Sequence, residues 1–326
     1  MRLTVTRLFT ALILLFVALA VSAQTQDGKV YRIGAILGTS KPEPIVDAFF
    51  DGLRDLGYVE GKNIVVERRY SEGRTERFPE LAAELVRLKV DLMVTFTTPA
   101  ALAARAATTT IPIIFPTAND PVGTGLAKSL AHPGGNVTGY AVLSPELSAK
   151  RLELLKEVVP RASRVAALYN AANPVNVPVL RQALEAARRL GIQLQPYEVR
   201  SVGDFAGAFA SIAKQRPDAL IVIGDQLTHQ HGNEIARFAR DTRLPSMFDT
   251  KDSAKAGGLM SYGPSYVAMS RHARFYADKL LRGANPADLP FEQASKFELV
   301  VNLNPAKALG ITIPQSILVR ADEIIR

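Results

Sequence analysis

The same order of segments occurs twice in this chain, and this duplication limits the possible folds more than any other feature. The first copy begins at RIGAIL (residues 32–37) and continues through FFDGLRDLGY, NIVVERRY, FPELAAELVRLKVDLMVTF and IPIIF. The second begins at RVAALYN (residues 164–170) and continues through LRQALEAARRLGI, QLQPYEV, FAGAFASIAKQRPDALIVIG and LPSMF. A spacing of 127 to 134 residues is too long for a stacked repeat and indicates two domains of one architecture. The matching landmarks are Arg32 and Arg164, Leu56 and Leu190, Asp91 and Asp218, and Pro112 and Pro245.

Within each copy, strand-like and helix-like segments alternate. Short continuous apolar runs such as DLMVTF, IPIIF and ALIVIG are typical of central strands that are covered on both faces. Between them, FPELAAELVRLK places Phe78, Leu81, Leu85 and Leu88 on one helical stripe. The alternation predicts an α/β fold of two similar lobes, each a parallel sheet flanked by helices with right-handed crossovers.

Some segments lie outside the duplication and predict that the chain crosses between the lobes more than once. They are a helix at residues 143–160, a helix at 266–282 and the segment FELVVNLNPAKALGITIP. We predict a multi-strand hinge near residues 141–145, 261–264 and 291–296, about which the lobes close on a ligand. The first lobe is then residues 30–142 plus 264–294, and the second is residues 143–263. Residues 295–326 form a returning C-terminal segment, and the sequence does not indicate which of the two lobes it joins.

The N-terminus reads as a secretory signal. Arg2 and Arg7 precede an apolar run of 14 residues, Leu8–Val21, whereas a spanning helix needs about 20. Val21 and Ala23 then occupy the small-residue positions of a cleavage site. We predict a signal peptide of residues 1–23, cleaved after Ala23, and a periplasmic protein; the alternative is an uncleaved anchor.

The carboxyl ends of the predicted strands carry the candidate binding residues, because ligands of such sheets bind there. Thr98, Asp120 and Asn173 each precede a proline, which predicts a helix cap followed by the first helical residue. With Thr97, the free amides behind Thr98 could hold a ligand carboxylate. Among the remaining strand ends are GDQLT and DTKDS.

Asp225, in GDQLT, could accept a ligand ammonium group, and Tyr262 and Phe248 could wall the pocket against an apolar side chain. Each of these residues also has a plainer role, as a helix cap, a solvated acid or part of the core.

Catalytic and cofactor motifs do not fit. A phosphate loop needs glycine directly before the lysine, but Gly125 stands three residues before Lys128. The chain has no cysteine and no G-x-S-x-G elbow, and His229 with His231 makes a poor metal pair. We therefore expect neither an enzyme nor a cofactor or metal. The net charge of +8 comes from scattered basic residues, so no nucleic-acid partner is expected.

The segments FDGLRDLGYVEGKNIVVERRYSEG, FPELAAELVRLKVDLMVTFTTPAALAA, RVAALYNAANP and, most specifically, DPVGTGLAKSLAHPGGNVTG carry a family resemblance. The chain resembles the substrate-binding proteins of bacterial ABC transporters, with the type I periplasmic-binding fold. Within them it is similar to the subfamily that includes proposed tryptophan and tyrosine binders. The resemblance implies three crossovers, a small ligand in the cleft between the lobes and delivery to an ABC permease in the inner membrane. The pocket residues that it implies are Thr39, Ser40, Thr97, Thr98, Thr117, Asp120, Asn170, Asn173, Asp225 and Tyr262.

We accordingly expect an exported, monomeric solute-binding protein whose ligand is a small amino acid or a related carboxylate. The chain has no tryptophan, so aromatic stacking on the ligand is not assured. The alternatives are an exported ligand sensor for a membrane receptor, and a hydrolase or transferase on the same scaffold. A repressor core is disfavoured because no helix-turn-helix precedes the first lobe.

Overall fold

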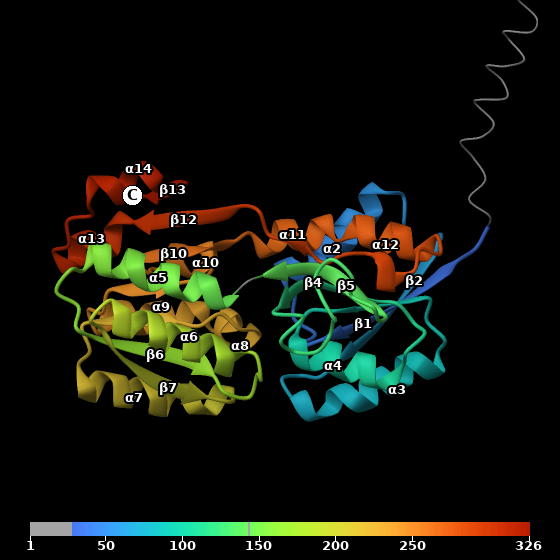
Figure 1. Ribbon diagram of the computed structural model, residues 1–326, viewed down its shortest axis with the longest axis horizontal. Coiled ribbons are helices and arrows are strands. Elements are labelled where there is room, and N and C mark those ends of the chain that lie inside the picture. Colours follow the sequence, from blue (N-terminus) through green and yellow to red (C-terminus); the bar gives the residue numbers. More distant parts are fainter. Residues whose placement is uncertain (1–27, 143) are drawn as a thin grey trace, which may run out of the picture.

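The computed structural model describes residues 28–142 and 144–326, and these residues form two α/β lobes that lie side by side (Figure 1). The predicted fold class is confirmed: each lobe is a mainly parallel sheet with helices on both faces. The predicted signal, residues 1–23, lies outside the described residues. Among the described residues, no helix is both long enough and apolar enough to cross a bilayer.

The first sheet has six strands in the order β11-β5-β4-β3-β1-β2, all paired in parallel. Its strands are β1 (Tyr31–Leu37), β2 (Ile64–Tyr70), β3 (Leu92–Thr95), β4 (Ile113–Asn119), β5 (Val137–Val142) and β11 (Glu292–Gln293). Its helices are α2 (Pro44–Asp55), α3 (Phe78–Arg87), α4 (Thr98–Ala107), α11 (Tyr266–His272) and α12 (Arg274–Leu281), with short 3-10 turns at Thr75–Arg77 and Pro286–Asp288.

The second sheet has seven strands in the order β13-β12-β10-β9-β8-β6-β7, with one antiparallel pair, β10 with β12. Its strands are β6 (Arg164–Asn170), β7 (Gln193–Val199), β8 (Ala219–Val222), β9 (Ser246–Phe248), β10 (Met260–Pro264), β12 (Phe297–Asn302) and β13 (Glu323–Ile325). Its helices are α5 (Ser144–Val158), α6 (Asn176–Arg189), α7 (Phe205–Gln215), α8 (Gln226–Gln230), α9 (Gly232–Asp241), α10 (Lys251–Lys255), α13 (Leu303–Leu309) and α14 (Gln315–Arg320), with a 3-10 turn at Val202–Asp204.

The central strands are buried because helices cover both of their faces. Every residue of β3 and β8 is buried, as their continuous apolar runs predict, whereas the edge strand β2 stays partly exposed. In the first lobe, Phe49 and Leu53 of α2 pack on one face with α12, and Leu81 and Leu85 of α3 pack on the other with α4. The second lobe is layered in the same way, with α5 and α6 opposite α7 and α9.

The chain passes from one sheet to the other between β5 and α5, between β10 and α11, and between β11 and β12. Because of the last passage, residues 297–325 complete the second sheet rather than the first. The crossing after β10 fixes α11 to the first lobe: Ser270 Oγ donates to Ile45 O at 2.6 Å, and the Arg271 guanidinium pairs with Asp55 at 2.6 Å. The carboxyl end of β10 therefore lies at the border between the lobes.

Candidate functional site

Loops at the carboxyl ends of the two sheets touch each other across the border between the lobes. Gln230 Nε2 of α8 donates to Glu43 Oε1, which lies just before α2, over 3.4 Å. Next to this contact, a β-carbon added to Gly38 after β1 would lie only 2.2 Å from Gln226 Nε2. Burial raises the pKa of the Glu43 carboxyl, as expected for an acid partly removed from water. The residues around this border form the candidate site.

In the first lobe, most of the predicted site residues carry hydroxyl groups, and two of them lie at the start of α4. Thr97 Oγ1 accepts from Ala100 N at 3.3 Å and caps α4, so the prediction that Thr98 is the cap is wrong by one residue. Thr98 is the first residue of α4 and is buried, as is Thr117 in β4. Thr95, at the end of β3, carries a buried hydroxyl that no described residue hydrogen-bonds. The N-terminus of α4 thus stands beside several polar side chains at the sheet's carboxyl edge.

The loop after β1 holds Thr39 and Ser40 near the surface. Thr39 Oγ1 accepts from Lys41 N at 3.2 Å, and Ser40 N donates to Glu72 Oε1 at 3.2 Å. Thr39 is half-buried and Ser40 is exposed, so the two residues line the rim of the border rather than its interior.

Asp120 corrects the prediction of a helix after β4. The residue lies in the left-handed region, with φ of 44°, and its Oδ1 accepts from Gly123 N at 2.8 Å. Residues 121–125 form turns instead of a helix. An aspartate followed by proline suits a helix start and a turn equally well, and the left-handed backbone turns the chain before a helix can begin.

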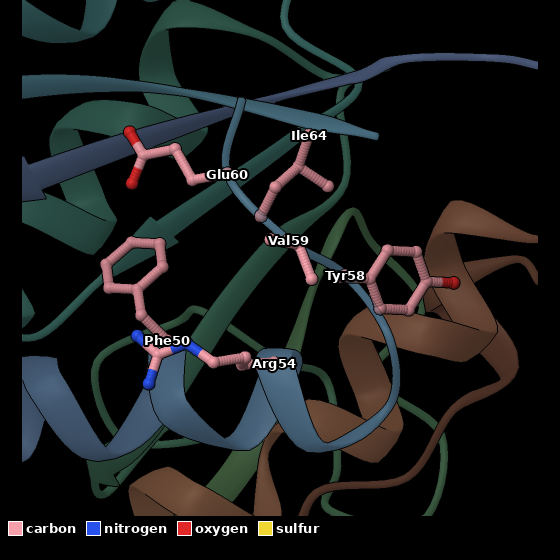
Figure 2. Close-up of a pocket in the computed structure, with 6 residues that line it drawn as sticks. All are labelled: Phe50, Arg54, Tyr58, Val59, Glu60 and Ile64. Carbon is pink, nitrogen blue, oxygen red and sulfur yellow. The ribbon is translucent and has the colours of Figure 1, made fainter. Parts of the chain in front are cut away.

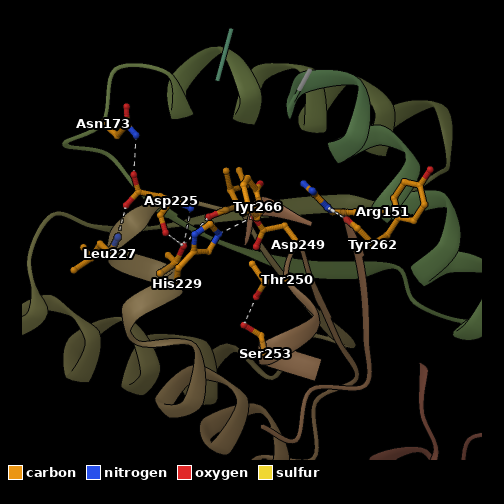
Figure 3. A network of polar contacts seen from close by, with 12 residues as sticks. Arg151, Asn173, Asp225, Leu227, His229, Asp249, Thr250, Ser253, Tyr262 and Tyr266 are labelled. Carbon is orange, nitrogen blue, oxygen red and sulfur yellow. Dashed lines mark hydrogen bonds and ion pairs between the residues drawn. The ribbon is translucent and has the colours of Figure 1, made fainter. Parts of the chain in front are cut away.

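In the second lobe, three predicted residues meet in one buried network (Figure 3). The Asp225 carboxylate accepts from Asn170 Nδ2 and Asn173 Nδ2, each at 2.7 Å, and from Leu227 N at 2.8 Å. It caps α8, and Thr228 completes a reciprocal capping box. All of these side chains are buried except that of Leu227, so a charge that would be costly alone is held by three donors. The prediction that Asn173 caps a helix is wrong, because α6 begins three residues later, at Asn176.

A second buried carboxylate, which sequence reasoning missed, follows β9. Asp249 Oδ2 lies 2.8 Å from His229 Nε2 and accepts from Tyr266 OH at 3.0 Å. Only 3% of the Asp249 side chain is exposed, against 31% of His229. The neighbouring strand end must be glycine, because a β-carbon on Gly224 would lie 1.7 Å from Asp249 Oδ2.

The electrostatics of this pair follow from its burial and its mutual charge. Burial alone would raise the pKa of Asp249, but the charge and hydrogen bond of His229 outweigh it and lower the pKa to about 2. Burial alone would lower the pKa of His229, but Asp249 raises it above the usual value. Burial raises the pKa of the Tyr266 phenol well above its usual value, and Asp249 adds to the effect. Asp249 thus stays ionised and favours the protonated form of His229, while the Tyr266 phenol is a neutral donor.

Tyr262, the last predicted site residue, lies half-buried in β10. Its ring packs on Phe297 with a centroid distance of 6.0 Å, and its carbonyl oxygen accepts from Arg151 Nε of α5 at 2.6 Å. Phe248 points into the core of the second lobe and does not wall a site. The rings of Tyr262, Tyr266 and Phe297 and that of Tyr140 gather around Val142 and Met269, where the chain crosses between lobes.

A shallow pocket of about 160 Å³ lies elsewhere on the first lobe (Figure 2). Its lining precedes or begins β2, so it opens near the amino edge of the sheet, away from the strand ends described above. It is lined by Phe50, Arg54, Tyr58, Val59, Glu60 and Ile64. Across the described residues, no group of three or more His, Asp or Glu side chains is arranged to hold a metal ion.

Comparison with known proteins gives consistent matches over most of the chain. Residues 34–325 match the family described as "ABC transporter substrate binding protein". A tyrosine-binding protein of Clostridioides difficile is 30% identical over 265 residues, which are 81% of this chain and 75% of that protein. A Streptococcus pneumoniae structure, an ABC domain in complex with L-Trp, superposes with a TM-score of 0.84 at 27% identity, covering 91% of this chain and 100% of that one. A conserved domain protein of Vibrio cholerae gives the same TM-score and coverage at 29% identity.

Proposed function

Since this chain belongs to the ABC transporter substrate-binding protein family, we propose that it is exported to the periplasm, where it captures an aromatic L-amino acid and delivers it to an ABC permease. In this proposal the protein is a monomer, closes about its hinge and releases the ligand unchanged. The relatives that bind tyrosine and L-Trp support the ligand class.

The observation that carries the proposal is the polar border between the lobes. The first lobe offers amide and hydroxyl donors at the start of α4, around Thr97 and Thr98, which suit a carboxylate. The second lobe offers the buried carboxylates of Asp225 and Asp249, which suit an ammonium group. An amino acid carries both groups on one carbon and can therefore engage both lobes at once.

The aromatic part of the ligand has a matching surface in this proposal. Tyr262 and Tyr266 are half-buried at the lobe border, and Phe297 packs on Tyr262. Rings of this kind favour an aromatic side chain through offset or edge-to-face contacts. The protein therefore needs no tryptophan for these contacts, because the tyrosine and phenylalanine rings at the crossings can provide them.

Closure follows from ligand contacts with both lobes. A ligand shifts the equilibrium between open and closed states only by its difference in affinity for the two. An amino acid held by donors of one lobe and carboxylates of the other gains most of its contacts in the closed state. The closed lobes then present one continuous outer surface to the permease.

The test is a binding measurement on the protein beginning at residue 24. Thermal unfolding and calorimetry are run with L-tryptophan, L-tyrosine, L-phenylalanine and L-leucine. At a ligand concentration of 100 times Kd, we expect about 2.7 kcal/mol of added stability, or roughly 5–10 °C in Tm, for an aromatic amino acid. Indole, which lacks both charged groups, is the matched control and should give no shift.

Chromatography of the released ligand tests binding without turnover. Recovery of unaltered amino acid is expected. A thermal shift with L-leucine but with none of the aromatic amino acids would refute the ligand class, and consumption of the bound compound would show an enzyme instead.

A further inference from the structure

Arg151 is a buried cation that the site described so far does not use. It lies two turns into α5, and only 2% of the residue is exposed. Its Nε donates to the Tyr262 carbonyl oxygen at 2.6 Å. Among the described residues its guanidinium forms no ion pair, since none of the seventeen N–O contacts within 4.0 Å involves it. A desolvated charge without a carboxylate partner is costly, which indicates a role beyond packing.

Neither neighbouring acid is paired with Arg151, and each keeps acceptor capacity for the ammonium group that the proposed function assigns to it. Asp249 pairs with His229 and accepts from Tyr266, and Asp225 accepts from two asparagine amides and one backbone amide. The positive charge of Arg151 influences Asp249, His229 and Tyr266 through space without contacting the Asp249 carboxylate. The cluster therefore has a negative side at the two aspartates and a positive side at Arg151.

The guanidinium reaches the edge of the second sheet that borders the first lobe. A β-carbon placed on Gly263, the penultimate residue of β10, would lie 3.4 Å from Arg151 Nη2. Three residues further on, the chain enters the first lobe at α11. Figure 3 shows the terminal nitrogens of Arg151 on the side that faces Tyr266, along the row of polar side chains from Asp225 to Tyr262.

We propose that Arg151 binds the carboxylate of the ligand from the second lobe, opposite the donors of α4 in the first lobe. This inference rests on the proposed function and narrows it, because it assigns the carboxylate a charged partner and makes a free carboxylate the group that is selected. A guanidinium suits this role better than an ammonium, since its planar fork matches both carboxylate oxygens. Ligands whose carboxyl group is an amide or is missing should bind poorly.

The test compares L-tryptophan with L-tryptophanamide, which keeps the ring and the ammonium group but has no carboxylate. Calorimetry is run on the wild type, Arg151→Gln and the control Arg181→Gln, which removes an exposed arginine of α6. The wild type should prefer the acid by on the order of 100-fold, as a charge-assisted bidentate contact predicts. Arg151→Gln should lower the affinity for the acid by about the same factor and change that for the amide less than about threefold. The control should match the wild type.

Arg151→Lys is a second variant for the case in which Arg151→Gln does not fold. It keeps the positive charge but lacks the planar, two-pronged guanidinium group. It should retain a preference for the acid, reduced by roughly tenfold. Equal losses for acid and amide in Arg151→Gln, or an unchanged preference in both variants, would overturn the assignment while leaving the proposed function standing. A wild type that binds none of the aromatic amino acids would instead remove the proposed function, and the assignment with it.

Discussion

The equivalent parallel strands of the two sheets end in side chains of different chemistry. In the second lobe, Asp225, Asp249 and Arg151 are buried, and donors or acceptors from several elements hold them. In the first lobe, Thr97 and Asp120 bind backbone amides three residues away in the chain. A buried charge must be surrounded by fixed partners, whereas a hydroxyl or a surface acid needs only a local turn. The charged groups of the second lobe therefore depend on partners from several elements, whereas Thr97 and Asp120 of the first lobe depend on local turns.

The largest effect is expected from removing the charge at the centre of the second-lobe network. Asp249→Asn leaves His229 and Tyr266 facing a neutral amide in a buried setting. Breaking one side of such a pair should reduce the free energy of unfolding by about 3 kcal/mol. Urea denaturation at pH 7 measures this, with Asp252→Asn, an exposed acid on α10, as the matched control. Equal stability of the two variants would mean that the network does not hold its lobe together.

The pH dependence of the His229–Asp249 pair tests this contrast between the lobes, because the described residues of the first lobe include no histidine–carboxylate ion pair. The pKa of His229 is raised in the fold, so its contribution is complete below about pH 6.5 and is lost as pH rises through the folded pKa. The pKa of Asp249 is lowered to about 2, so its contribution is complete above about pH 4 and is lost as pH falls toward 2.

His229→Gln keeps a donor near Asp249 and removes the titrating charge. Near pH 5 the free energy of unfolding should be about 1 kcal/mol higher for the wild type than for this variant, and this difference should shrink as the pH is raised to 9. Denaturation curves at several pH values measure the gap, with the exposed His132→Gln as control. A gap that does not change with pH would show that the imidazole acts through packing alone.

The smallest effect is expected at the first-lobe acid. Asp120→Asn keeps an oxygen that can accept from Gly123 N, and asparagine tolerates the left-handed backbone well. The free energy of unfolding should change by less than about 0.5 kcal/mol, as measured by urea denaturation beside Asp249→Asn. If Asp120→Asn lowered the free energy of unfolding nearly as much as Asp249→Asn does, the proposed difference between the lobes would be wrong.

Sequence reasoning predicted the fold, which the structure confirms, whereas the site residues that it named stay predictions. The repeated segments predicted two parallel-sheet lobes, and the position of Asp225 after an apolar run predicted a polar group at a strand end. Asp249 has the same position after an apolar run, in the strand-end segment DTKDS, but nothing in that segment predicts that it pairs with His229. Arg151 gave no signal, because its helical sequence does not tell how far its side chain reaches.

The wrongly predicted helix starts share one cause, which is the ambiguity of a polar residue followed by proline. A hydroxyl, amide or carboxylate followed by proline fits a helix start or a turn, and the two differ only in the backbone angles that follow. This ambiguity misplaced the cap of α4 by one residue and the start of α6 by two, and it predicted a helix after Asp120 where the chain turns.

The sequence by itself determined the duplicated α/β plan, since apolar periodicity and the order of segments are properties of neighbouring residues. Only the tertiary structure decided which charges are buried together, because Arg151, Asp225, His229, Asp249 and Tyr266 come from segments far apart in the chain. Their protonation and partners depend on distances and desolvation that arise only when the sheet edges and the crossings assemble.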